Sequence, residues 1–119
     1  GKSIKSLCES VVKAIDDALS KAKTKTKKNT YERHHIVAKA AKAAQPARDV
    51  LSNRRVRIGL NSPLNLVDIK YNLHRHLHTN AYYNAVNVLV QRGSGSYTKT
   101  VSILNFIRSA LMAASKVTP

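Results

Sequence analysis

The sequence predicts a mostly helical protein with a small amount of β-structure. Residues 4–22, 71–91 and 99–115 carry apolar side chains at the three- and four-residue spacing of amphipathic helices. The chain has five Tyr, one Phe and no Trp, so aliphatic side chains must fill most of the interior. Such a composition favours helices over a β-sandwich or barrel. A chain of 119 residues suits one domain.

Shorter elements are expected between the long helices. Gly93-Ser94-Gly95-Ser96 should separate the last two helices, because glycine and serine favour turns. The other expected elements are a β-compatible run at 31–37, a helical segment at 38–44, a helix that begins near Pro46 and ends before Gly59, a turn at 61–63 and a second β-compatible run at 64–69.

The segment from Lys21 to Asn29 alternates lysine with threonine. Its like charges repel one another, so we expect a mobile linker or an arm that contacts phosphates. We therefore divide the chain into an N-terminal helix with a basic linker, residues 1–30, and a main domain, residues 31–119, within one compact unit. The sequence begins at Gly1 without a methionine, and we expect it to be a fragment of a longer protein.

The charge is strongly unbalanced. The 21 Lys and Arg residues oppose six Asp and Glu, which gives a formal net charge of +15. Twelve of the 21 basic residues lie between Lys21 and Arg57. This excess is larger than solubility requires and indicates a polyanionic partner: nucleic acid, an anionic membrane surface or an acidic protein.

Several other classes of protein are excluded. The single cysteine, Cys8, rules out an internal disulfide and any zinc site with several cysteines. No apolar run reaches the roughly 18 residues of a membrane span, and no signal peptide is visible. We find no motif for a small-molecule cofactor.

The histidines are the candidate reactive groups. His74 and His78 are four residues apart on the expected helix 71–91, so they share one face and can bind one transition metal. His76 points roughly the opposite way and is excluded. His34 and His35 are neighbours in a β-compatible run, where adjacent side chains face opposite sides. One of them can reach a metal while the other reaches a different group.

An arrangement in which one imidazole binds a metal and its neighbour stays free suits the hydrolysis of a phosphodiester bond. A metal held by three imidazoles keeps coordination positions for water and phosphate, and it stabilises charge on the leaving oxygen. A free imidazole titrates near neutral pH and can take the proton from the attacking water. Histidines at helical spacing are also common as ordinary solvated residues, so the pair His74 and His78 is weak evidence by itself.

Three sequence motifs together resemble the HNH nuclease superfamily, and most closely its AHH-type branch. The resemblance covers about residues 31–90. The motifs are Glu32-Arg33-His34-His35-Ile36-Val37, then Ser62-Pro63-Leu64-Asn65-Leu66, and then His74-Arg75-His76-Leu77-His78-Thr79, followed by Tyr82-Tyr83 and Val86-Asn87.

The resemblance implies a fold and a set of roles. The fold is mostly α with a small β-hairpin, a ββα-metal finger embedded in a helical domain. His34, His74 and His78 would bind the metal, and His35 would be the general base. Asn65 would brace the hairpin loop and orient the base, with Asn61 as the alternative. Two departures are visible: Arg33 stands where the branch has Ala, and the stretch between His35 and Asn65 is long.

Five arginines are candidates for binding nucleic acid, because guanidinium groups suit bidentate contact with phosphate. Contacts of this kind position a nucleic acid without reading its sequence. For the arginines between Pro46 and Gly59, the alternative interpretation is that they form a solvated helix face. The five are Arg48, Arg54, Arg55, Arg57 and Arg75.

Our leading hypothesis is a metal-dependent endonuclease that cuts DNA with little sequence preference. Zn²⁺ is the expected metal, because imidazole ligands suit zinc better than magnesium, although Mg²⁺, Ni²⁺, Co²⁺ or Mn²⁺ are alternatives.

The resemblance also implies a toxin domain at the C-terminal end of a secreted bacterial protein, delivered into the cytoplasm of a target bacterium in competition between bacteria. A cognate immunity protein, expected to be acidic, would then protect the producer. The alternatives are a ribonuclease toxin, for example against transfer RNA, and a non-catalytic basic nucleic-acid-binding module.

Overall fold

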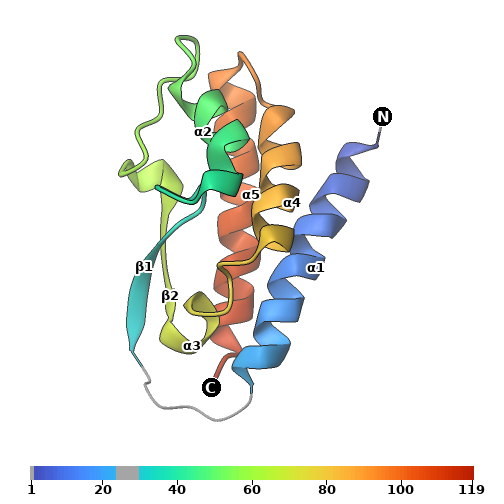
Figure 1. Ribbon diagram of the computed structural model, residues 1–119, viewed down its shortest axis with the longest axis vertical. Helices are drawn as coiled ribbons and strands as arrows, with labels where there is room; N and C mark the ends of the chain where they lie inside the picture. Colours follow the sequence, from blue (N-terminus) through green and yellow to red (C-terminus); the bar gives the residue numbers. More distant parts are fainter. Residues whose placement is uncertain (1, 24–29) are drawn as a thin grey trace.

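A two-stranded antiparallel hairpin lies against a group of helices (Figure 1). The computed structural model describes residues 2–23 and 30–119. The predicted fold class, mostly α with a small β-hairpin, is confirmed. In chain order the elements are α1 (Ile4–Ala22), β1 (Tyr31–His35), the 3-10 turn η1 (Lys42–Ala44), α2 (Gln45–Ser52), the 3-10 turn η2 (Pro63–Asn65), β2 (Leu66–Lys70), α3 (Tyr71–His74), α4 (Asn80–Gln91) and α5 (Tyr97–Lys116).

The long helices follow the predicted apolar patterns. Helix α1 has the predicted bounds, and it begins where the Ser3 hydroxyl accepts a hydrogen bond from the Ser6 amide. Helix α5 begins two residues before the predicted start, because Ser96 caps it by accepting a bond from the Lys99 amide. The turn predicted at 93–96 separates α4 from α5, and Gly95 adopts a left-handed φ of 75° there.

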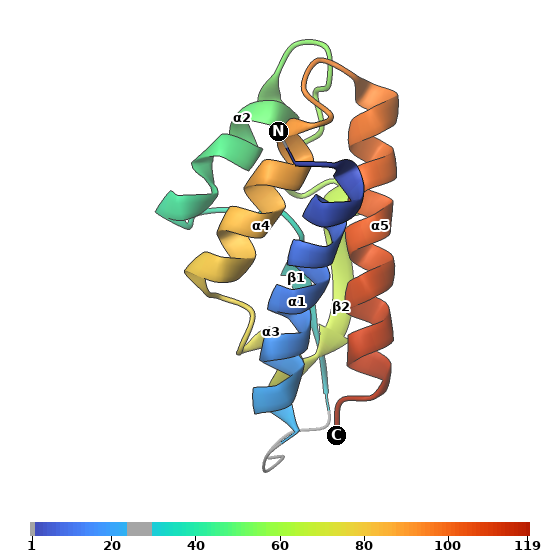
Figure 2. The ribbon, with the colours of Figure 1, turned by 90° about the vertical axis from the view of Figure 1, so that its right-hand side faces the viewer.

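One hydrophobic core joins all the layers. Figure 2 shows α1 lying between α4 and α5, with the hairpin behind it. Because α1 contributes to the core that also supports the hairpin, the N-terminal helix is packed into the same unit as the rest. The fully buried core side chains include Val11, Ile15, Ile36, Ile69, Leu73, Leu77, Leu89, Leu104, Ile107 and Leu111.

The hairpin is fixed from the side of α5. Strand β1 pairs with β2 so that His34 lies opposite Val67 and His35 opposite Leu66. The amide of Lys70, at the end of β2, donates to the Ser115 hydroxyl at 2.8 Å, and Lys70 Nζ donates to the carbonyl oxygen of Thr118 at 2.6 Å. The C-terminal part of the described chain thus holds the far end of the hairpin.

The single helix predicted for residues 71–91 is wrong. The structure divides it into α3 and α4, with residues 75–79 between them. The division arises because the Thr79 hydroxyl accepts a hydrogen bond from the Tyr82 amide and so starts a new helix. Leu77 in the intervening turn is fully buried and anchors it to the core. His74 and His78 therefore do not share the face of one helix.

Three further expectations need correction. Residues 38–44 form bends and the short turn η1 instead of a longer helical segment. Strand β1 ends at His35, and β2 begins at Leu66 because Ser62 caps the 3-10 turn that precedes it.

The predicted basic linker falls mostly on residues 24–29, which lie outside the described residues. No helix in the described ranges is long and apolar enough to cross a membrane.

Candidate active site

Strand β1 divides its side chains between two faces. Alternation along the strand directs Glu32 and His34 toward α3 and α4, and it directs Arg33 and His35 to the outer face. His34 is only 2% exposed, whereas His35 is partly exposed. The adjacent histidines thus point to different surroundings, as the alternation in a β-strand predicts.

Three imidazole rings gather on the inner side of β1. The ring centroid of His34 lies 5.1 Å from that of His74 and 6.1 Å from that of His78, and the latter two are 5.0 Å apart. Imidazoles that bind one tetrahedral metal at a nitrogen–metal distance of about 2 Å have centroids about 5 Å apart. The turn at 75–79 thus brings together the two histidines that a continuous helix was expected to align.

A buried tyrosine fixes the hydrogen position on His34. The Tyr82 hydroxyl donates to the carbonyl oxygen of Ile36 at 3.0 Å, and His34 Nε2 lies 3.0 Å from the same hydroxyl oxygen. Burial raises the pKa of Tyr82, so its hydroxyl keeps its one hydrogen. Since that hydrogen is given to Ile36, Nε2 of His34 must be the donor in the second contact. In neutral His34 the lone pair is then on Nδ1.

Nδ1 of His34 is buried and has no hydrogen-bond partner among the described residues. Burial lowers the pKa of His34 well below its usual value, and the nearby rings of His74, His78 and His35 lower it further. The imidazole therefore stays neutral at ordinary pH. A buried nitrogen lone pair without a partner is costly unless something binds it.

The other two rings are also held through one nitrogen each. Nδ1 of His74 donates to Oε1 of Glu32 at 2.9 Å, because a carboxylate can only accept. Nδ1 of His78 lies 3.0 Å from the Tyr83 hydroxyl. Burial lowers the pKa of His78, as does the His74 ring, while Glu32 opposes the shift. In both rings Nδ1 makes the hydrogen bond, so Nε2 is the nitrogen that could bind a metal.

The donor chemistry fits a metal, although the site is not preformed. Within residues 2–23 and 30–119, no three His, Cys, Asp or Glu groups are arranged to hold an ion as they stand. The orphaned Nδ1 of His34 and the outer hydrogen bonds of His74 and His78 are nevertheless what a histidine-based metal site requires. The residues present therefore fit a divalent transition metal, and binding it requires side-chain adjustment.

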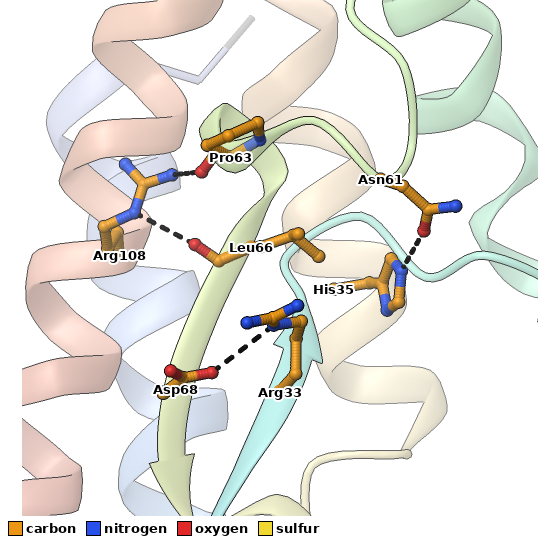
Figure 3. A network of polar contacts seen from close by, with 7 residues as sticks. All are labelled: Arg33, His35, Asn61, Pro63, Leu66, Asp68 and Arg108. Carbon is orange, nitrogen blue, oxygen red and sulfur yellow. Dashed lines mark hydrogen bonds and ion pairs between the residues drawn. The ribbon is translucent and has the colours of Figure 1, made fainter.

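The sequence suggested that one asparagine braces the loop and orients the base, but two asparagines share these tasks. Asn65 is fully buried and spans the loop: its Oδ1 accepts from the Val37 amide at 2.8 Å, and its Nδ2 donates to the carbonyl oxygens of Val37 and Leu60 at 3.1 and 3.0 Å. Asn61, the alternative named from the sequence, contacts the base candidate instead. Its Oδ1 lies 2.8 Å from His35 Nε2 (Figure 3).

Arg108 of α5 supports the segment that carries these asparagines. Its guanidinium donates to the carbonyl oxygens of Pro63 at 2.9 Å and Leu66 at 3.3 Å (Figure 3). It also donates to the carbonyl oxygen of Leu64 at 2.5 Å. Sequence reasoning did not find this contact, because Arg108 lies more than 40 residues from its partners. A guanidinium bound to three carbonyls helps to fix this stretch of backbone.

The five candidate nucleic-acid-binding arginines differ in their surroundings. Arg48 is partly buried and donates to Ala38 O at 2.8 Å and to the Gln45 side chain, so it supports the loop after β1. Arg54, Arg55 and Arg57 are exposed on the turn after α2, and Arg57 adopts a left-handed φ of 49°. Arg75 is exposed beside His74, and its guanidinium carbon lies 5.7 Å from the centre of the Tyr71 ring.

Sequence reasoning missed the residues that hold the imidazoles. Glu32 was visible two positions before His34, where strand alternation places it on the same face, but its partner His74 depends on the unexpected turn. The contacts of Tyr82 and Tyr83 with histidines also depend on where α4 begins. His76 makes no ring contact with the three clustered histidines in the described structure, and it stays outside the site.

The fold and the histidines together define a class of protein. A hairpin followed by helical turns, with paired histidines on its first strand, is the arrangement that the sequence motifs implied for an HNH-superfamily nuclease. The family model of the AHH nucleases, a nuclease family of the HNH/ENDO VII superfamily with conserved AHH, matches residues 15–110. The chain belongs to this family, so nuclease activity and a nucleic-acid substrate follow. Neither the curated proteins nor the solved structures include a significant match.

Proposed function

We propose that this protein is a metal-dependent endonuclease that hydrolyses DNA with little sequence preference. The observation that carries the proposal is the buried, unpartnered Nδ1 of His34, which lies in a cluster with His74 and His78. These three residues would hold the metal. When bound, the ion would polarise the scissile phosphate and stabilise charge on the leaving oxygen. We propose Zn²⁺ because imidazoles suit it best, with Ni²⁺, Co²⁺, Mn²⁺ and Mg²⁺ as the ions to compare.

His35 is the proposed general base. The amide oxygen of Asn61 accepts a hydrogen bond, so His35 Nε2 carries the hydrogen in their 2.8 Å contact. Nδ1 of His35 then has the lone pair that takes a proton from the attacking water. Asn65 keeps the loop between His35 and Asn61 in place through Val37 and Leu60, which makes it a positioning residue.

The exposed arginines are the proposed contacts for the nucleic-acid backbone. Arg54, Arg55 and Arg57 present three guanidinium groups on one turn, and Arg75 presents another beside His74. Such groups neutralise phosphates irrespective of sequence, which supports a low sequence preference. Arg48 has internal partners, so its proposed contribution is to support the loop that follows β1.

Plasmid cleavage tests the activity. Wild-type protein with added Zn²⁺ should nick and linearise plasmid DNA, and a chelator should stop the reaction. His35→Ala should lower the rate by about a hundredfold or more, as expected for loss of a general base. His76→Ala is the matched control and should cut at the wild-type rate. Cleavage by His35→Ala at the wild-type rate would show that another group is the base.

Metal analysis tests the ligands separately from activity. About one ion per chain should be retained by wild-type protein and by His35→Ala, and it should be lost in His74→Ala and His78→Ala. If the purified protein binds nucleic acid tightly but takes up no metal and cuts nothing, it is a binding module and the proposal fails.

The substrate is tested by offering plasmid DNA and total RNA side by side at the same metal concentration. Metal-assisted hydrolysis does not use the 2′-hydroxyl, so the proposed chemistry works on either polymer. We expect DNA to be cut faster. Faster cleavage of transfer RNA would make the protein a ribonuclease that uses the same site.

We further propose that the domain acts as a toxin in the cytoplasm of a target bacterium and that an acidic immunity protein restrains it. The formal charge of +15 makes fast association with an acidic protein physically reasonable. Induced expression in the cytoplasm of a test bacterium should stop growth, whereas expression of His35→Ala should not. Equal growth with the two proteins would count against the toxin role.

A further inference from the structure

Arg33 occupies the position of the alanine in the family's conserved Ala-His-His triplet. His34 and His35 are the one adjacent pair of histidines in the chain, so we assign the family's triplet to Arg33-His34-His35. An alanine side chain ends at Cβ and offers no charge. At the same place this protein has a guanidinium with five hydrogen-bond donors on a long, flexible stem.

The hairpin directs Arg33 to the same face as the proposed base. Residues two apart on a strand share a face, so Arg33 and His35 both lie on the outer side of β1, away from the clustered histidines. Figure 3 shows Arg33 and His35 beside each other on β1, with Asn61 beyond the imidazole. The added charge therefore lies next to the group proposed to activate water, not next to the metal ligands.

Asp68 is the cross-strand partner of Arg33. The register pairs the two residues, and Nε of Arg33 lies 3.6 Å from Oδ1 of Asp68. The side chains are 67% and 61% exposed, and an ion pair in such a setting is weak. The two terminal nitrogens of the guanidinium have no partner among the described residues, so they can bind an anion.

We propose that Arg33 binds a backbone phosphate of the substrate next to the scissile one, and that Asp68 holds the guanidinium over the hairpin until substrate arrives. The proposal rests on the nuclease function proposed above. The 3.6 Å contact with Asp68 is too long for a hydrogen bond, whereas a phosphate placed at the terminal nitrogens can accept two charge-assisted hydrogen bonds from the guanidinium. Contact with Arg33 would fix the strand beside His35 without reading bases.

Binding of a short DNA duplex tests the contact independently of cleavage. The measurement uses the His35→Ala protein, which should bind without cutting, over a series of salt concentrations. Adding Arg33→Ala, which restores the family's residue, should weaken binding several-fold irrespective of sequence and should reduce the slope of log K against log salt by about 1. Arg33→Lys should keep most of that slope, because it keeps the charge.

Two further variants make the test specific. Lys99→Ala removes one exposed positive charge from the first turn of α5, where Lys99 lines a hollow with Ile4 and Phe106, and should leave the salt slope unchanged. Asp68→Asn should tighten binding when Arg33 is present and have a smaller effect in the Arg33→Ala protein. An unchanged affinity and slope in Arg33→Ala, or an equal change in Lys99→Ala, would overturn the proposal.

Steady-state cleavage separates this inference from the proposed function. Arg33→Ala should raise KM several-fold and leave kcat within about twofold, because the contact is made to bound substrate before and during the reaction. A fall in kcat without a change in KM would overturn a phosphate-binding role. If wild-type protein fails to cut any nucleic acid, the nuclease proposal fails, yet the salt dependence of binding still decides whether Arg33 contacts phosphate.

Discussion

Oε1 of Glu32 accepts a hydrogen bond from Nδ1 of His74 at 2.9 Å, and this pair joins the first strand of the hairpin to the last residue of α3. The bond fixes which nitrogen of His74 carries hydrogen, and it leaves Nε2 as the nitrogen that can bind the proposed metal. Outer partners of this kind orient metal-binding histidines and increase their basicity.

Removing this carboxylate should weaken metal binding. Glu32→Gln should reduce Zn²⁺ affinity by about 10- to 100-fold, the usual effect of losing an outer partner of a ligand. Competition against a chromophoric chelator measures the change. Glu9→Gln, on the exposed face of α1, is the matched control. Equal affinities in the two variants would mean that Glu32 does not support a ligand.

Tyr82→Phe should destabilise the protein and loosen His34. The substitution leaves Nε2 of His34 without an acceptor and the Ile36 carbonyl without its side-chain donor, both in a buried region. We expect a loss of about 1–3 kcal/mol in the free energy of unfolding, measured with urea in the presence of chelator. Tyr97→Phe, at an exposed tyrosine, should change the free energy little. Equal stabilities would rule out the bridging role of the hydroxyl.

The two asparagines should separate stability from activity. Asn65→Ala removes three hydrogen bonds from a fully buried position and should cost about 3 kcal/mol in the free energy of unfolding. Asn61→Ala, at an exposed residue, should change stability by less than about 0.5 kcal/mol and still lower kcat, because His35 loses its partner. Thermal unfolding and plasmid cleavage give both readouts. A stable Asn65→Ala protein would contradict the bracing role.

Metal-free protein should lose stability as the pH falls below about 6.5. Burial lowers the pKa of His34 well below the value of 6.5 that an unperturbed histidine has, and burial lowers that of His78 as well. Well above pH 6.5 both states are neutral at these positions. Below it the unfolded chain binds protons that folded His34 does not, so the free energy of unfolding should fall by about 1 kcal/mol per pH unit near pH 5.5. Urea titrations with chelator at pH 7.5 and 5.5 check this, and equal values would contradict it.

The sequence was informative where the physics is local. Alternation along 31–37 was enough to separate the surroundings of His34 and His35, and the apolar spacing of 4–22 gave the bounds of α1. The division of 71–91 was missed because a periodic apolar pattern continues through it, and the N-cap at Thr79 is a weaker signal. Yet this division is what determines how His74 and His78 reach His34.

Long-range contacts account for the rest. Tyr82 and His34 are 48 residues apart, and Glu32 and His74 are 42 apart, so neither contact has a local sequence signal. The asparagine assignment shows the same limit. Asn61 is the first residue of the turn signal at 61–63, and Asn65 follows that signal by two residues. Only the path of the loop decides that Asn65 spans it while Asn61 reaches His35.

The contacts from α5 to the hairpin have a consequence for how the protein is made. Arg108 binds the carbonyl of Leu66, and Ser115 and Thr118 bind the end of β2 through Lys70, over separations of 42 to 48 residues. A ribosome synthesises these partners after it has made both strands of the hairpin. While α5 is still being synthesised, the hairpin lacks these hydrogen bonds. A nascent chain should therefore remain inert beside the nucleic acids of the cell that translates it, and it should mature into a nuclease only after α5 has emerged and docked.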